Sequence, residues 1–166
     1  SLEAAPAARV VHVSSNTHGV VGRFDFTDWN WERRPFVSIP AYAHTKLAIL
    51  LFNRALARRL NGTRVRSNAL HPGIIATGLG TSHPRFGKFI NPIVRPIFLT
   101  PEQGAMTSIY VATSPDIETH QGAYFEDSRL AKPGRWAQDD VAAERLYSLA
   151  TSLLADRGHA AVRRAA

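Results

Sequence analysis

The chain has 166 residues, of which 45% are hydrophobic, and 20 basic against 13 acidic residues give it a net charge of +7. This length corresponds to about one domain, and this hydrophobic content excludes a disordered or fibrous protein. The absence of cysteine excludes disulfides, zinc–thiolate sites and thiol nucleophiles, and it fits a reducing, cytoplasmic location.

The positive charge is spread along the chain rather than gathered in a stripe. Its closest groupings are isolated pairs near the expected ends of helices and strands: Arg33-Arg34, Arg58-Arg59 and Arg163-Arg164. Basic side chains there complement the helix dipole, so we expect no nucleic-acid partner. No apolar run reaches the roughly 18 residues that cross a bilayer, and residues 1–8 lack the layout of a signal peptide. We therefore expect a soluble protein without a membrane span.

The first half of the chain predicts a strand, a helix and a second strand. Residues 9–13 form a β-branched run that polar residues close, which is typical of a buried strand. Apolar residues recur at helical spacing over residues 42–60, with Pro40 suited to a first turn and Asn61-Gly62 as the stop. Residues 65–70 then predict a second strand. This order is a βαβ unit with parallel strands.

The second half begins with an irregular, strongly apolar stretch over residues 78–100. Thr100, Pro101 and Gln103 then form the N-cap, first-turn proline and capping-box positions of a helix that should run to about Thr113. Residues 122–125 predict a last short strand. Asp139 or Asp140 is expected to cap a final helix through Leu154, with Gly158 beyond its end.

Polar side chains gather where these elements meet one edge of the sheet. Ligands bind outside the carboxyl ends of parallel strands, and Ser14 and Ser15 leave the first strand there, Tyr42 opens the helix and His71 leaves the second strand. Tyr42 and Lys46 are four residues apart and share a helix face. A tyrosine is a poor proton donor or acceptor at neutral pH unless a nearby cation favours the phenolate. Singly these signals are weak, because serines after a strand are most often a turn.

Four segments, in order, resemble the C-terminal, catalytic part of the short-chain dehydrogenase/reductase family, with the retinol-dehydrogenase-like branch closest. Arg9-Val-Val-His-Val-Ser-Ser15 is similar to the family's serine motif. Tyr42-Ala-His-Thr-Lys46 is similar to its Tyr-x-x-x-Lys helix, and His71-Pro-Gly-Ile-Ile-Ala-Thr77 to its Pro-Gly-x-x-x-Thr segment. The fourth consists of Thr100-Pro-Glu-Gln-Gly-Ala105 and Gly122-Ala-Tyr-Phe125, which resemble a later helix and the final strand.

The resemblance implies an oxidoreductase that uses NADP or NAD to interconvert a small-molecule alcohol and a carbonyl. Tyr42 would be the acid/base, Lys46 would modify it and bind the nicotinamide ribose, and Ser15 would orient the substrate oxygen. The implied cofactor contacts are Tyr42, Lys46, Pro72, Gly73, Ile75 and Thr77. Residues 78–100 correspond to the variable substrate lid, which suggests a lipophilic substrate, although core packing explains their apolar character equally well.

The sequence also departs from the family's pattern. The glycine-rich turn that holds the pyrophosphate and the Asn-Asn-Ala-Gly element are absent. We therefore expect residues 1–166 to form a single partial domain of the α/β class. It would be the C-terminal portion of a Rossmann-type doubly wound parallel sheet, β-α-β-lid-α-β-α, without its N-terminal dinucleotide-binding half. An exposed sheet edge is a liability, so a second copy in a homo-oligomer or the absent half would cover it.

Other interpretations remain open to different degrees. The serious alternative is a non-catalytic remnant of the fold that acts as an assembly or interaction module. Asp25 and Asp28 could be imagined as a glycosidase pair, but turn acids are favoured. The histidines do not complete a set of metal ligands, so no metal is expected. The long interval between Ser15 and Tyr42 holds Trp29 and Trp31, which could border a substrate entrance.

Overall fold

The structure is a computed structural model that describes residues 2–74 and 99–165. Its strands are β1 (Ala8–Val13), β2 (Val65–His71), β3 (Tyr124–Glu126) and β4 (Arg129–Ala131). Its α-helices are α1 (Ser38–Arg59), α3 (Pro101–Thr113) and α4 (Asp140–Ala165). Short 3-10 helices are η1 (Leu2–Ala4), η2 (Asn16–Val20), η4 (Pro115–Thr119) and η5 (Arg135–Gln138). The expected lid lies, apart from its last two residues, outside the described residues.

The four strands form one sheet in the order β1-β2-β3-β4. β1 pairs with β2 in parallel, with Ala8 opposite Val65, and β2 pairs with β3 in parallel. These pairings confirm the predicted α/β class and the predicted βαβ unit. β4 was not predicted: it returns antiparallel to β3 through a tight turn in which Asp127 and Ser128 have positive φ angles of 50° and 56°.

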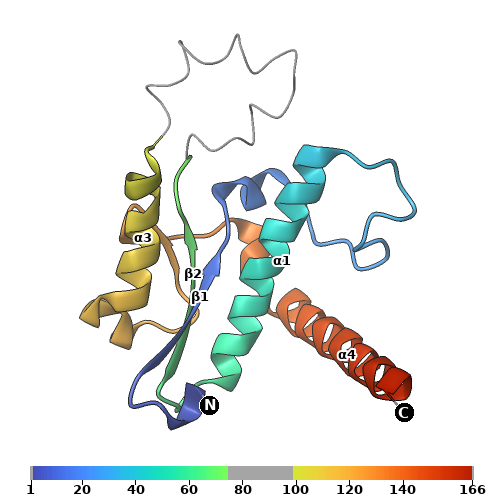
Figure 1. Ribbon diagram of the computed structural model, residues 1–166. Coiled ribbons are helices and arrows are strands. Elements are labelled where there is room, and N and C mark those ends of the chain that lie inside the picture. The colour runs from blue at the N-terminus through green and yellow to red at the C-terminus, as the bar shows by residue number, and fades with distance from the viewer. Residues whose placement is uncertain (1, 75–98, 166) are drawn as a thin grey trace.

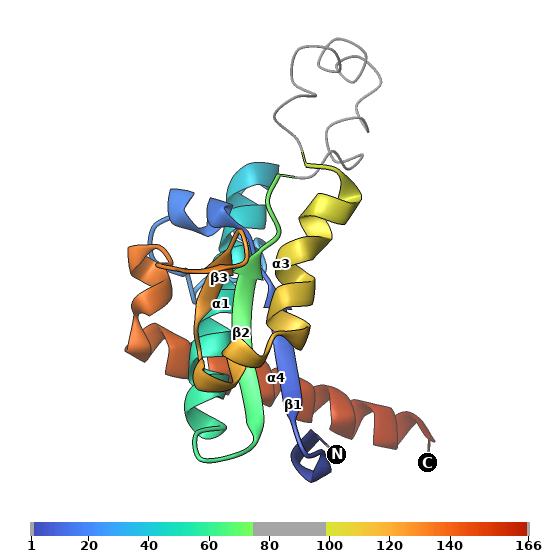
Figure 2. The same cartoon turned by 90° about the vertical axis from the view of Figure 1, so that its left-hand side faces the viewer.

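Helices cover both faces of the sheet, with α1 and α4 on one side and α3 on the other (Figures 1 and 2). Successive side chains along β2 point to opposite faces of the sheet and pack in different clusters. Ala69 packs in the cluster that contains α1, whereas its neighbour Leu70 packs with Val111 of α3. A strand buried on both faces must have small, apolar or hydrogen-bonded side chains at every position, and β2 combines Ala69 and Leu70 with the buried, hydrogen-bonded Ser67 and Asn68.

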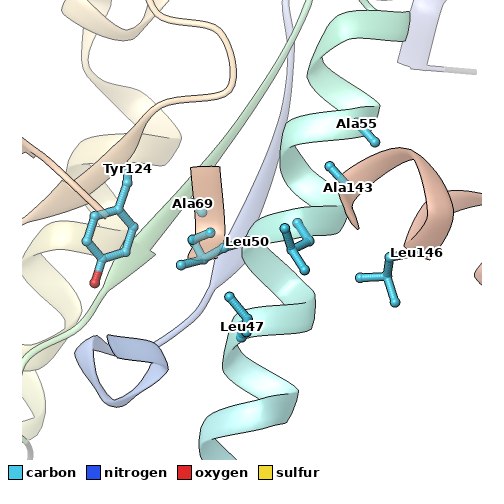
Figure 3. Close-up of a cluster of buried hydrophobic side chains, with 9 residues drawn as sticks. Leu47, Leu50, Ala55, Ala69, Tyr124, Ala143 and Leu146 are labelled. Atoms are coloured by element: carbon cyan, nitrogen blue, oxygen red, sulfur yellow. The ribbon is translucent and has the colours of Figure 1, made fainter. Parts of the chain in front are cut away.

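The larger of the two cores lies between α1, α4 and the sheet. Leu47 and Leu50 of α1 reach toward Ala69 and Tyr124, as Figure 3 shows, and α4 packs against the outer side of α1. Leu47 is fully buried. Burial of a leucine side chain of this kind contributes about 1.5–3 kcal/mol, so α1 is the element on which the packing of this half depends.

The ends of the helices test the sequence predictions closely. The capping box of α3 is present, with Gln103 N donating to the Thr100 hydroxyl, as predicted. α1 begins at Ser38, four residues before the predicted start, and it includes Pro40 in its first turn. Asp139 caps α4 by accepting from Ala142 N at 3.0 Å.

The predicted end of the last helix was wrong. α4 does not stop after Leu154 but runs through Gly158 to Ala165. A glycine inside a helix costs only about 1 kcal/mol relative to alanine, and the alanines and arginines that follow are strong helix formers.

No helix in the ranges that the structure describes combines the length and hydropathy needed to cross a bilayer.

Candidate functional site

Two reciprocal hydrogen bonds join α1 to the carboxyl end of β1. The buried hydroxyl of Ser14 donates to the backbone carbonyl of Lys46 at 2.8 Å, and Lys46 Nζ donates to the backbone carbonyl of Val13 at 3.1 Å. We call this pair of bonds the latch. An ammonium has three N–H donors, and the latch uses one of them. The Lys46 charge is therefore held at the edge of the sheet with donor capacity for a further polar group.

Tyr42 lies one helical turn before Lys46 and presents its ring to that charge. Lys46 Nζ is 5.3 Å from the centre of the Tyr42 ring, within the range of a cation–π interaction. The Tyr42 side chain is 42% exposed, unlike its neighbours Ala41 and Ala43, which are buried. The structure thus brings these two predicted site residues together at a solvent-accessible position.

Ser15 lies at the same edge, just past the end of β1. It is the N-cap of η2, where its hydroxyl oxygen accepts from Thr17 N at 3.3 Å, and it is only 5% exposed. Because its oxygen accepts in that bond, the hydroxyl proton of Ser15 can donate to another group. Its backbone carbonyl accepts from His18 Nδ1 at 2.6 Å. The serine is thereby fixed through both its backbone and its side chain.

The segment after β2 leaves from the neighbouring position on the same edge. His71 ends the strand, and Gly73 has a φ of +85°, a conformation that favours glycine. A Cβ on Gly73 would meet the side chain of Leu99, and Leu99 N donates to the Ile74 carbonyl at 2.8 Å. Pro72 and Gly73 therefore lie where the predicted cofactor segment begins.

Two further residues predicted to contact the cofactor, Ile75 and Thr77, lie outside the described residues, as does nearly all of the expected lid. Their predicted roles stay predictions. The described ends of that interval are Ile74 and Leu99, which the backbone hydrogen bond at 2.8 Å joins directly.

Burial decides the charge state of the polar groups behind this edge. Burial lowers the pKa of His71 below its ordinary value, so its ring is neutral near pH 7, and its Nε2 lies 3.9 Å from Glu126 Oε1. Burial also raises the pKa of Tyr124, and the nearby Glu126 carboxylate adds to the effect. Tyr124 is 4% exposed, and within the described part of the chain its hydroxyl has no hydrogen-bond partner. Of Tyr42 and Tyr124, only Tyr42 is both accessible and beside a cation.

The loop before α1 is organised by the two aspartates that the sequence analysis weighed. Asp28 is buried, and its Oδ1 accepts from Glu32 N at 2.8 Å and from Arg33 N at 3.0 Å. Asp25 pairs with Arg34 at 3.1 Å. Both carboxylates are thus occupied in holding the turn, which supports their interpretation as turn acids.

The two tryptophans of this loop have different surroundings. Trp31 packs with its ring centre 5.9 Å from that of His44 on α1, and the Arg34 guanidinium covers it at 3.9 Å. Trp29 is more exposed. The predicted entrance role of either ring stays a prediction.

Two residues that organise the site, Ser14 and His18, had no role predicted from the sequence. Ser14 forms half of the latch, and His18 holds Ser15. The signal for Ser14 was its position as the first of two serines after a strand, where its side chain points to the face opposite to that of the second. No three His, Asp or Glu residues lie close enough to hold a metal ion within residues 2–74 and 99–165.

Comparison with known proteins finds relatives that are named as dehydrogenases. Human retinol dehydrogenase 13 is 37% identical over 158 residues, covering 92% of this chain and 47% of that protein. Mouse retinol dehydrogenase 14 is 40% identical over 152 residues, covering 89% and 45%, respectively. No family model matches the sequence.

A solved structure supports the same family assignment as these relatives. The crystal structure of an uncharacterised protein from Mycobacterium paratuberculosis matches with a TM-score of 0.66 at 29% identity, covering 89% of this chain and 50% of that one. This match and the parallel strand pairing confirm the predicted Rossmann-type fold. The chain spans about half the length of the curated relatives it matches. By the identity of these relatives and by its fold, the chain belongs to the short-chain dehydrogenase/reductase family, in the branch of the retinol dehydrogenases.

Proposed function

We propose that this chain carries the catalytic groups of an NAD(P)-dependent oxidoreductase that interconverts a lipophilic alcohol and its carbonyl compound. The observation that supports this most directly is the latch, which holds the Lys46 ammonium 5.3 Å from the Tyr42 ring, at the edge where Ser15 lies. Tyr42 acts as the general acid or base at the reacting oxygen. Ser15 donates its hydroxyl proton to the same oxygen and fixes its position.

The donors at this edge fit a nicotinamide cofactor. Lys46 gives one N–H to Val13 and can direct others to the hydroxyls of a nicotinamide ribose. Tyr42 and the backbone of Pro72 and Gly73 lie along the same edge, where ligands of open α/β sheets bind. When bound, the nicotinamide supplies or accepts the hydride. NAD and NADP carry the same nicotinamide ribose, so these contacts suit either cofactor.

The substrate class rests on two features. The relatives that match are named for retinol, an apolar alcohol. In this chain large apolar side chains are exposed just before α1, in its first turn and just after β2, namely Phe36, Val37, Ile39 and Ile74. Apolar side chains next to polar groups at one edge suit an amphiphilic substrate whose oxygen reaches Tyr42 while its hydrocarbon lies on this surface.

The first experiment is thermal melting of the 166-residue chain with and without NADH or NADPH. A ligand that binds only the folded state, at about ten times its dissociation constant, stabilises by about 1.4 kcal/mol. For a protein of this size, that corresponds to a rise in melting temperature of about 3–6 °C. Lys46→Met should abolish the rise, whereas the matched surface change Lys132→Met should leave it intact.

Turnover provides the second half of the test. With retinaldehyde and the cofactor that stabilises the chain, Tyr42→Phe should abolish reduction while leaving the cofactor-dependent rise in melting temperature largely in place. A chain that melts cooperatively but responds to neither cofactor would contradict the proposal for these residues alone. It would favour the alternative of an assembly module, whose melting temperature would instead depend on protein concentration.

A further inference from the structure

His18 forms hydrogen bonds with both of its ring nitrogens, and each goes to a different part of the chain. Nδ1 lies 2.6 Å from the Ser15 carbonyl oxygen, and Nε2 lies 2.8 Å from Gly134 N. A backbone N–H can only donate and a carbonyl can only accept. The ring must therefore carry its proton on Nδ1 and accept on Nε2, which fixes one neutral tautomer.

The surroundings of His18 hold this ring in a single orientation. The side chain is 4% exposed, and its ring packs edge-on against Tyr124 with the centres 5.4 Å apart. On the other side, a Cβ added to Gly134 would lie 3.2 Å from the ring atoms Cδ2 and Nε2. A side chain at this position would crowd the ring, so glycine suits the close approach of the backbone that donates to it.

The two partners of His18 are far apart in sequence. Ser15 begins the turn after β1, whereas Gly134 is the N-cap of η5, in the segment that follows β4. Besides this bridge, η2 and η5 pack on one another, and both pack on α1. His18 is therefore a polar bridge between the serine turn and the C-terminal part of the fold.

We propose that His18 is a positioning residue for the reaction, which acts through Ser15 and is itself positioned by Gly134; this inference rests on the proposed function. The Ser15 carbonyl accepts from His18 N at 3.2 Å and, at 2.6 Å, from Nδ1, so the side chain adds the shorter of two bonds that orient this carbonyl and the plane of the peptide that follows the serine. The Ser15 Cα–Cβ bond, and the direction in which its hydroxyl can donate, are set by that backbone. A displacement of about 1 Å at a positioned group is enough to cost a large factor in rate.

Two substitutions separate the halves of this bridge. In His18→Asn the side-chain amide nitrogen can take the place of Nδ1 and donate to Ser15, but nothing reaches Gly134. In His18→Gln the amide oxygen can take the place of Nε2 and accept from Gly134, but the Ser15 carbonyl loses its side-chain donor and keeps only the backbone bond from His18 N at 3.2 Å. Both changes remove one buried hydrogen bond, so both should lower the melting temperature to a similar degree.

The two variants should differ in kcat although their melting temperatures are similar. At saturating cofactor, His18→Gln should lower kcat by about fivefold to tenfold with the KM for cofactor unchanged, as expected for loss of a positioning contact. His18→Asn should keep kcat within about twofold of the wild type. Equal losses of kcat in the two variants would overturn the proposal, because a purely structural role would affect both alike.

A readout that needs no turnover keeps this test separate from that of the proposed function. The ¹³C carbonyl resonance of Ser15, labelled selectively, reports the hydrogen bonding of that oxygen in the chain without cofactor. It should shift in His18→Gln and stay near its wild-type position in His18→Asn. If no variant or wild type turns over, the proposed function fails for this chain. The carbonyl resonance then decides alone, and equal shifts in the two variants would overturn the positioning role.

Discussion

Gly73 offers a quantitative test of how the segment after β2 is held. Its φ of +85° is a conformation that costs a residue with a side chain about 1–2 kcal/mol. Restricting the unfolded chain returns about 0.4–1 kcal/mol of this when alanine replaces glycine. In addition, a new Cβ would meet a terminal methyl of Leu99, which must leave its rotamer at a cost of about 0.5–1.5 kcal/mol. Gly73→Ala should therefore destabilise the fold by about 1.5–2.5 kcal/mol.

Two other glycines provide matched controls. Gly62 has a φ of +81° but nothing within 4 Å of an added Cβ, so Gly62→Ala measures the backbone cost alone, about 1 kcal/mol. Gly22 has neither a positive φ nor a neighbour within 4 Å, and Gly22→Ala should be neutral or slightly stabilising. The urea midpoints of the three variants should decrease in the order Gly22→Ala, Gly62→Ala, Gly73→Ala, with unchanged m-values.

A double-mutant cycle isolates the contact with Leu99. In a Leu99→Ala background the added Cβ has room, so Gly73→Ala should cost about as much as Gly62→Ala, a coupling of about 0.5–1.5 kcal/mol. Additive effects of the two changes would refute the reasoning, because they would mean that the close approach of Leu99 to Gly73 does not contribute to the folded state.

Three further predictions concern stability. Asn68 is buried, donates to the His120 carbonyl at 3.0 Å and accepts from Ala123 N at 2.8 Å, so Asn68→Ala should cost about 2–4 kcal/mol in urea denaturation, against almost nothing for the exposed Asn61→Ala. Asp139→Ala removes the N-cap of α4 and should cost about 1 kcal/mol, visible as a lower melting temperature. Burial lowers the pKa of His71 from 6.5, so the unfolded chain binds a proton there that the folded chain does not. Stability should fall as the pH drops from about 7 to 5, and His71→Gln should flatten this part of the profile; an unchanged slope would contradict the assigned cause.

The elements that the sequence predicted well are those whose signal is local. The capping box at Thr100 and Gln103 is a short-range pattern, and it forms as expected. β2 was predicted as an extended segment between the helix stop at Asn61-Gly62 and Pro72, and its position is correct to within one residue. The pairing of Tyr42 with Lys46 follows from helical periodicity alone, since residues four apart share a face.

The features that the sequence did not predict depend on partners distant in the chain. β4 exists because Asp127 and Ser128 adopt positive φ angles that turn the chain back on β3, a choice that neither residue type forces. The end of α4 was predicted from one glycine, whose small helix penalty did not decide the outcome. The role of His18 required knowledge that Gly134, 116 positions away, lies against its ring.

The latch also explains why the candidate catalytic groups lie at the boundary between core and solvent. Because Lys46 is tied to the end of β1, the helix axis places Tyr42 about 6 Å further along, at 1.5 Å per residue, beyond the end of the strand. Leu47 and Leu50, on the other side of the latch, are buried in the core. The two bonds of the latch thus fix the position along the sheet at which α1 presents Tyr42 to solvent, while Ala41 and Ala43 on either side of it stay buried.

The opposite end of α1 is joined to α4 by ion pairs. Arg54 and Arg58 both pair with Asp140, and Arg59 pairs with Glu144 at 2.7 Å, which joins α1 to the first turns of α4. A single exposed ion pair contributes little, but several that share partners across a packed interface restrict sliding and rotation. Since α1 is fixed at the latch and again at α4, the position of Tyr42 relative to Ser15 is set by the fold before any substrate binds. Such preorganisation is what the proposed acid/base role of Tyr42 requires.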